Sequence, residues 1–235
     1  MLLNAQGAAR LLGTSERQIY RWVDDGELPC RRVRDQLRFN RTDLLEWATS
    51  RRLPVHVEAF EEDDPDDHAP SLAAALRIGG AHRDVPGVDR ESVLHSVVDR
   101  MALPPALDRE MLVEVLLARE ATGTTAMGEG VAIPHVRNPV VAAGARAAVT
   151  VCYLASPVPF GAPDGRPVQT IFMMVTPTVR AHLQMLARLA RALTDAGFKA
   201  AIDRRAAIAD LVREAERIEH AAPSAAARSD EESAE

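Results

Sequence analysis

A histidine that directly follows a predicted strand is the residue of this chain best placed to do chemistry. The segment before His135 contains the glycines Gly128 and Gly130, a short apolar run over residues 131–133 and then a proline. The apolar run predicts a buried strand, and the proline fixes the backbone where that strand ends. A neutral imidazole offers a nitrogen lone pair near pH 7 and can accept a phosphoryl group. Alone, such a histidine is more often a plain polar surface residue, so its surroundings decide between the two interpretations.

Two other residues have types suited to holding phosphate. His182 falls in the first turns of a helix predicted to begin at Thr176 with Pro177 in its first position, outside the leucine stripe of that helix. Arg119 falls at the C-terminal end of a helix predicted to begin near Asp108, and its guanidinium can neutralise phosphate oxygens. The plainer interpretations are a capping or surface histidine and an arginine that complements its own helix dipole.

The elements that position these residues alternate between helix and strand from residue 92 onward. Strand-like apolar runs cover 147–154 and 168–175, and two further short helices are predicted around 198–202 and 206–218. The predicted inward faces of the three longer helices are Val93, Leu94, Val97, Val98 and Met101; Met111, Leu112, Val115 and Leu116; and Leu183, Leu186, Leu189, Ala190 and Leu193. Interleaved helices and strands predict an α/β layered domain with a mixed sheet flanked by helices.

The first 53 residues have a different pattern. Asn4 is placed to cap a short helix that Gly13 ends, and the segment Thr14-Ser15-Glu16 is placed to cap a second helix from Glu16 to Asp24, which is typical of a helix-turn-helix. A basic hairpin over 31–39 and a helix over 44–48 follow, which together predict a small α domain with a β wing.

Charge divides the chain further. Residues 1–53 hold ten arginines and seven acidic residues, a net +3, whereas residues 54–235 hold 18 basic and 27 acidic residues, a net −9. We therefore expect a winged helix-turn-helix at 1–53, an acidic disordered linker at 54–72, the α/β domain at 73–218 and a disordered tail at 219–235.

The apolar runs and the cysteine content indicate the expected cellular compartment of the protein. No apolar run reaches 18 residues, and the first residues do not resemble a secretory signal, so membrane insertion and secretion are not expected. Cys30 and Cys152 are the only cysteines, so neither a disulfide framework nor a zinc site is predicted. We therefore expect a reduced, cytoplasmic protein.

Residues 3–52 resemble the excisionase-type, MerR-like winged helix-turn-helix family. The matching segments are Ala8-Ala-Arg-Leu-Leu-Gly-Thr-Ser15, Ile19-Tyr-Arg-Trp22, Gly26-Glu-Leu-Pro29 and Asp43-Leu-Leu-Glu-Trp47. The resemblance implies DNA binding, with Arg17, Gln18 and Arg21 contacting bases or phosphates and Arg32, Arg34 and Arg38 contacting phosphates from the wing. A module of this fold that only docks proteins, with its arginines as a solvated face, is the alternative.

Residues 72–218 resemble the fructose/mannitol and nitrogen-regulatory type of enzyme IIA from the bacterial phosphoenolpyruvate-dependent phosphotransferase system. The matching segments are Arg119-Glu120, Thr124-Thr-Ala-Met-Gly-Glu-Gly-Val-Ala-Ile-Pro-His135 and His182-Leu-Gln-Met-Leu-Ala-Arg-Leu-Ala190. The resemblance implies that His135 accepts a phosphoryl group from the histidine-containing phosphocarrier protein and that Arg119 and His182 line the site. The segment Val136-Arg-Asn-Pro139 departs from the family, in which many members have a small residue directly after the histidine. Arg137 is expected either to strengthen phosphate binding or to change which partner docks.

These resemblances together imply a regulator that links phosphorylation of His135 to DNA binding or to recruitment of a third regulatory protein. No nucleotide-binding loop is present, so we expect a phosphohistidine carrier rather than an autonomous enzyme, with no cofactor and no metal. Backbone N–H groups around Gly128–Gly130 are expected to add a small anion nest. The alternatives are a plain phosphocarrier for carbohydrate uptake with a protein-docking N-terminal module, and a sensor that is not phosphorylated.

Overall fold

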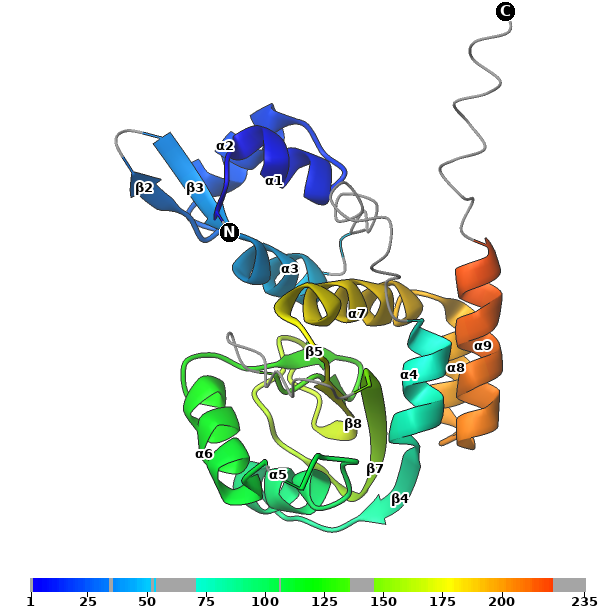
Figure 1. Ribbon diagram of the computed structural model, residues 1–235. Coiled ribbons are helices and arrows are strands. Elements are labelled where there is room, and N and C mark those ends of the chain that lie inside the picture. Colours follow the sequence, from blue (N-terminus) through cyan, green and yellow to red (C-terminus); the bar gives the residue numbers. More distant parts are fainter. Residues whose placement is uncertain are drawn as a thin grey trace, which may run out of the picture.

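A computed structural model of the chain describes residues 2–33, 36–51, 53, 71–105, 107–135 and 146–221. The predicted linker, apart from residues 71 and 72, therefore lies outside the described residues, as does the tail from 222. Figure 1 shows a small N-terminal domain above a larger one built around a curved sheet. None of the helices in the described ranges is long and apolar enough to cross a membrane.

The N-terminal domain is a winged helix-turn-helix, as predicted. Its helices are α1 (Ala5–Leu11), α2 (Glu16–Asp24) and α3 (Arg41–Ser50), and its strands are β1 (Leu2–Leu3), β2 (Arg31–Val33) and β3 (Gln36–Asn40). The predicted caps are confirmed, because the Asn4 side chain accepts from the Gly7 N–H and the Ser15 side chain from the Gln18 N–H. The strands form an antiparallel sheet in the order β1-β3-β2, in which β1 was not predicted.

The larger domain contains a five-stranded mixed sheet in the order β4-β7-β8-β6-β5. The pairs β4–β7 and β6–β8 are parallel, and β7–β8 and β5–β6 are antiparallel. The strands are β4 (Ala81–Val85), β5 (Ala126–Gly128), β6 (Val131–Ala132), β7 (Ala148–Val158) and β8 (Val168–Val175). This confirms the predicted fold class.

Helices cover both faces of this sheet, which is why the central strands are apolar on both sides. They are α4 (Leu72–Gly79), α5 (Arg90–Val98), α6 (Arg109–Glu120), α7 (Val179–Ala192), α8 (Ala196–Asp203) and α9 (Ile208–Ala221). In β7, Val151 and Tyr153 belong to the apolar cluster that includes α4, α7, α8 and α9, whereas Cys152 belongs to the cluster that includes α5 and α6.

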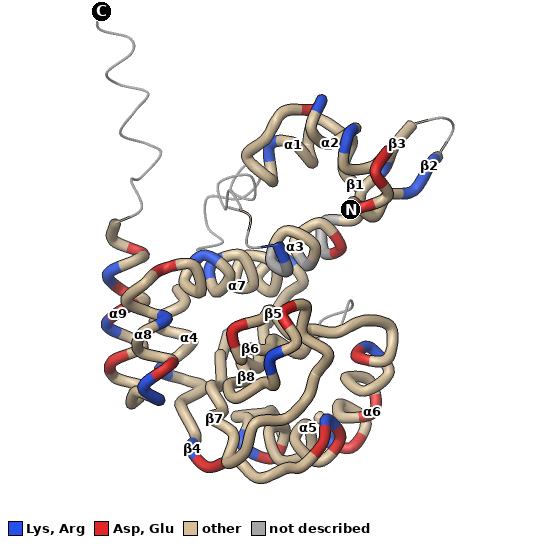
Figure 2. Tube along the Cα trace, turned by 180° about the vertical axis from the view of Figure 1, so that it is seen from behind, with Lys and Arg blue, Asp and Glu red and all other residues tan. Residues whose placement is uncertain are grey.

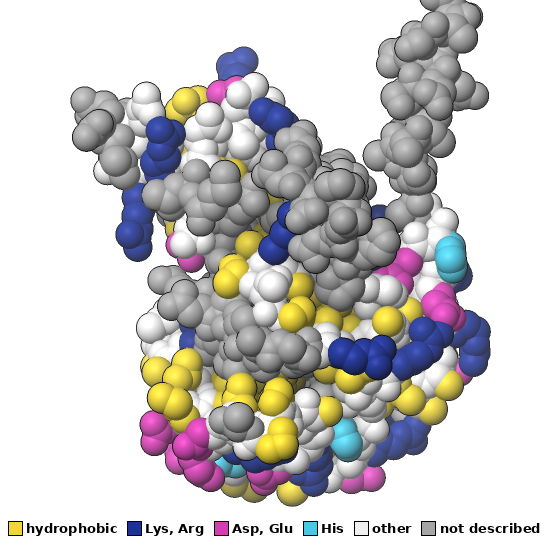
Figure 3. Space-filling view, viewed as in Figure 1, with side chains coloured by type: hydrophobic (Ala, Val, Ile, Leu, Met, Phe, Trp, Pro, Cys, Tyr) yellow, Lys and Arg dark blue, Asp and Glu magenta, His cyan; other side chains and the backbone are white. Residues whose placement is uncertain are grey.

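Three expectations for the larger domain are wrong in detail. On α6, Met111 and Val115 are 63% and 44% exposed rather than inward, and Figure 3 shows hydrophobic side chains gathered over that helix. The inward stripe of α6 includes Leu112, Leu116 and the carboxylate of Glu120 instead. The helix predicted to start at Thr176, with Pro177 in its first position, begins at Val179, because Thr178 caps it: the Thr178 side chain accepts from the Ala181 N–H.

The third difference lies at the C-terminal end. Residues 219–221, predicted as part of a disordered tail, continue α9. The Glu219 carboxylate accepts from the Leu72 N–H and the Ser71 hydroxyl, and it pairs with Arg188 at 3.1 Å. A carboxylate at the N-terminus of α4 satisfies backbone donors that the helix itself leaves open, so this glutamate joins α4, α7 and α9.

Candidate phosphoryl-acceptor site and DNA-binding surface

A tight hairpin places His135. Strands β5 and β6 pair with Ala126 opposite Ala132, and the turn between them holds Gly128, Glu129 and Gly130, all with positive φ (84°, 52° and 76°). The left-handed conformation suits the two glycines and is strained at the glutamate. Beyond β6, the Ile133 N–H donates to the Thr125 carbonyl, which keeps the chain beside the start of β5 up to His135.

The His135 ring is oriented by its own backbone. Its Nδ1 lies 2.6 Å from the carbonyl oxygen of Ile133. A carbonyl oxygen only accepts hydrogen bonds, so Nδ1 carries the proton in this pair and the lone pair of the neutral ring is at Nε2. The residue is 9% exposed.

His182 lies beside His135. The two ring centroids are 6.0 Å apart, with the ring planes inclined by 42°. His182 belongs to the first turns of α7, as predicted, but it is only 3% exposed, so the interpretation as a surface histidine is wrong. The fold thus brings together two imidazoles that are distant in the sequence.

Arg119 lies at the end of α6, as predicted, and its Nη1 donates to the Gly123 carbonyl at 2.9 Å. Gly123 is two residues before Thr125, to which the strand leading to His135 is hydrogen bonded. Arg119 is therefore held at the base of the same hairpin, although its functional role remains a prediction.

Glu120 is a supporting residue, named from the sequence only as part of the matching segment Arg119-Glu120 and without a role. Its side chain is buried, and its carboxylate accepts from the Thr125 hydroxyl at 2.6 Å and from the Thr125 N–H at 3.0 Å. These bonds fix the start of β5 against the end of α6. A glutamate at the C-terminal end of a helix is unfavourable for the helix dipole, and that was the available signal.

Within the turn expected to form an anion nest, one backbone N–H already has a partner in the chain. The Glu129 N–H donates to Asp164 Oδ2 at 2.7 Å. This bond, followed by one from the Arg166 N–H, holds the pKa of Asp164 below its usual value. The turn lies at the opposite end of β6 from His135, so these N–H groups do not extend the histidine site.

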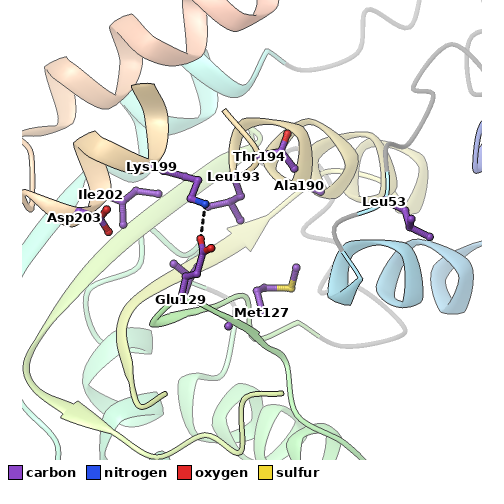
Figure 4. Close-up of a pocket in the computed structure, with 11 residues that line it drawn as sticks. Leu53, Met127, Glu129, Ala190, Leu193, Thr194, Lys199, Ile202 and Asp203 are labelled. Atoms are coloured by element: carbon purple, nitrogen blue, oxygen red, sulfur yellow. Dashed lines mark ion pairs between the residues drawn. The ribbon is translucent and has the colours of Figure 1, made fainter. Parts of the chain in front are cut away.

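A separate hollow of ≈ 520 Å³, part of it open solvent, lies along this turn. Glu129 and Lys199 form an ion pair at 2.6 Å in its wall (Figure 4). Leu53, from the end of the N-terminal domain, lines it together with Met127 and other apolar residues of the larger domain. Neither His135 nor His182 lines the hollow, so it is distinct from the histidine pair.

The predicted DNA-reading helix is open to solvent. On α2, Ile19 is fully buried, whereas Arg17 and Arg21 are exposed and Tyr20 between them is 48% exposed. Gln18 is half-buried. Figure 2 shows basic residues along α2 and β2, at the side of the N-terminal domain turned away from the larger domain.

The predicted wing arginines are divided by the register of the hairpin. Arg31 pairs with Arg38, and Arg32 pairs with Leu37. Because paired residues point to the same face and neighbours to opposite faces, Arg38 shares a face with Arg31 and not with Arg32. Arg38 also donates to Gln36 Oε1 at 2.6 Å. Arg34 lies outside the described residues.

Two family models match the chain. Residues 81–215 match the phosphoenolpyruvate-dependent sugar phosphotransferase system EIIA 2 family, and residues 2–52 match a helix-turn-helix domain.

Several relatives of the larger domain are nitrogen regulatory proteins. A nitrogen regulatory protein of Pseudomonas aeruginosa is 34% identical over 126 residues, covering 52% of this chain and 79% of the relative. A nitrogen regulatory protein of Bradyrhizobium diazoefficiens is 35% identical over 108 residues, covering 45% of this chain and 69% of the relative. Among solved structures, nitrogen regulatory protein IIA-Ntr from Neisseria meningitidis is 26% identical, with a TM-score of 0.48 over 57% of this chain and 91% of that one.

Proposed function

The chain belongs to the EIIA 2 family of the phosphoenolpyruvate-dependent sugar phosphotransferase system and carries an N-terminal helix-turn-helix domain, and from this we propose that it is a DNA-binding regulator phosphorylated on His135. The observation that carries the proposal is the pair of buried imidazoles, one of them oriented by a backbone carbonyl, in the domain that defines the family.

The proposed donor is a histidine-containing phosphocarrier protein. Nε2 of His135 attacks the phosphorus in line, the Nε2–P bond forms, and the P–N bond of the donor breaks. The electron pair of that bond returns to the donor's imidazole. His135 keeps its Nδ1 proton, so its ring becomes cationic, and the hydrogen bond to the Ile133 carbonyl becomes charge-assisted and stronger.

Positive charge near the phosphoryl group is the other requirement. The transferred group carries negative charge on its oxygens, and a donor fixed in position stabilises that charge without reorganising. His182 is within reach of a group bonded to the neighbouring ring, and Arg119 is held at the base of the same hairpin. We assign His182 as a hydrogen-bond donor to the phosphoryl oxygens and Arg119 as a charge partner.

A regulatory role is supported by the names of the relatives and by the domain fused to this chain. The exposed α2 surface, with Arg17, Gln18 and Arg21, is the proposed reader of duplex DNA.

Incubation with phosphoenolpyruvate, enzyme I and the phosphocarrier protein tests the first half of the proposal. The protein should acquire an acid-labile, base-stable phosphoryl label, and His135→Ala should abolish it while His182→Ala keeps a slower one. Full labelling of His135→Ala would exclude His135 as the acceptor.

A further inference from the structure

Helix α3 is buried on two opposite sides. Trp47 packs edge-on against Trp22 of α2, with ring centroids 4.8 Å apart. Leu45 is two residues away, which turns its side chain by about 200° around the helix, yet it is fully buried. The core of the small N-terminal domain therefore covers only one side of α3.

The other side of α3 packs against α7 and β5 of the larger domain. Figures 1 and 2, seen from opposite sides, both show α3 lying directly along α7. The buried apolar residues of α3, namely Leu44, Leu45, Trp47 and Ala48, belong to the same continuous cluster as Leu183, Leu186 and Ala187 of α7. The two domains thus share one core in this structure.

Leu53 extends the contact past the end of α3. It is half-buried and packs against the shared cluster. It lines the same hollow as Met127, Ala190 and Leu193 of the larger domain, whose side chains are drawn in Figure 4. Substitutions at Leu53 therefore address the contact without removing a residue from the centre of either domain.

The elements that receive α3 also frame the histidine site. His182 is part of α7, and β5 pairs with β6, about 4.8 Å away. His135 follows the last residue of β6 by three residues, at most about 10 Å of extended chain. A stable protein partner covers about 800 Å² of each surface, a disc of about 16 Å radius. A disc of that size centred on His135 therefore reaches β5, the strand against which α3 packs.

We infer that the helix-turn-helix domain, docked through α3, is an autoinhibitory contact that withholds His135 from the phosphoryl donor. The inference rests on the proposed phosphorylation of His135. In this structure His135 is 9% exposed, and α3 packs on α7 and β5, the two elements that frame the histidine site. The donor and α3 therefore compete for the surface around His135. Docking of the domain lowers the affinity for the donor by the same factor by which a bound donor disfavours docking.

The chain permits undocking. Residues 54–70 connect the domains and can span roughly 60 Å when extended. The exposed arginines of α2 are not part of the α3 contact, so the undocked domain keeps its proposed DNA-binding surface.

The experiment compares the full-length protein with Leu53→Asp, and with Leu53→Met as the matched control that keeps an apolar side chain. Small-angle scattering reports docking through the radius of gyration, and the initial rate of labelling by a limiting concentration of phosphorylated phosphocarrier reports access to His135. Leu53→Asp should have a larger radius of gyration and label about fivefold faster or more, whereas Leu53→Met should match the parent protein.

A larger radius with an equal or slower rate would overturn the inference, the slower rate indicating that the donor uses the docked domain as part of its binding surface. If Leu53→Asp keeps the radius of gyration of the parent protein, the same two measurements are made on the double variant Leu45→Glu/Leu53→Asp. A double variant that still has the parent's radius also overturns the inference. Failure of every protein, parent included, to label would instead contradict the proposed phosphorylation itself.

Discussion

The imidazole ring of His182 lies 6.0 Å, centroid to centroid, from that of His135, and both residues are buried. One ring is carried by the first turns of a long helix and the other by the end of a short strand, so their relative position depends on the packing of α7 against the sheet. The pair is a property of the folded domain and not of either segment.

His182→Ala should slow phosphorylation of His135 without moving the label. Removing one fixed donor to a developing negative charge typically costs about 10²–10³ in rate. Single-turnover labelling with the phosphorylated phosphocarrier measures the rate, and a peptide map locates the label. Arg191→Ala, an exposed position on the same helix, is the control and should label like the parent. An unchanged rate for His182→Ala would remove His182 from the site.

Glu120→Ala should destabilise the domain by about 2–4 kcal/mol, because the buried Thr125 N–H and hydroxyl are left without their acceptor. Glu120→Gln keeps one carbonyl oxygen as acceptor and should cost less. Urea unfolding followed by circular dichroism gives both values. If Glu120→Gln lost more stability than Glu120→Ala, the carboxylate would not be the acceptor that holds the start of β5.

Alkaline pH should lower the free energy of unfolding of the larger domain. Burial raises the pKa of Cys152 from 9.0 to about 12 and that of Tyr153 from 10.0 to about 12. The unfolded chain therefore loses these protons first, and the folded chain binds more of them. The resulting stabilisation is complete below pH 9 and is lost as the pH rises towards 12. Cys152→Ala should have a shallower decline in the free energy of unfolding between pH 9 and 11, whatever its stability at pH 7.

Substitutions of Arg17 and Arg38 should affect DNA binding in different ways. Arg17→Ala on α2 should reduce discrimination between sequences, by roughly 1–3 kcal/mol for each base that the side chain no longer reads. Arg38→Ala should weaken binding to all sequences and lower the slope of log affinity against log salt by about 0.9. Arg32→Ala, on the other face of the hairpin, is the comparison. Fluorescence anisotropy over a salt series measures all three, and undetectable binding of the parent at about 50 mM salt would favour protein docking.

Local signals were sufficient for much of this fold. The capping residues Asn4 and Ser15, the apolar runs of β7 and β8 and the short apolar run of β6 each determine structure within a few residues, and each prediction is confirmed. The strand β4 was missed because it is a polar edge strand, Ala-His-Arg-Asp-Val, with its last residue fully buried but little alternation before it. The Met111 and Val115 error arose because a helix with apolar residues on several sides does not identify its inward face.

Contacts between distant segments could not be read from the sequence. Glu219 was placed in a disordered tail, since its partners at residues 71, 72 and 188 are far away along the chain. The burial of α3 on two sides has the same origin. Its apolar residues fit a helix that packs against its own domain, and only the fold shows that α3 also packs against α7.

The ion pair between Glu129 and Lys199, near the seam where α3 and Leu53 pack against the larger domain, has a practical consequence for chemical labelling. Lys199 is the only lysine of the chain, and it forms an ion pair with Glu129 in the wall of the hollow that Leu53 also lines. An amine-reactive fluorophore added above the pKa of the α-amino group therefore has two targets, the N-terminus and this one side chain. With the N-terminus blocked, a single dye reports the environment of the seam, without any engineered cysteine.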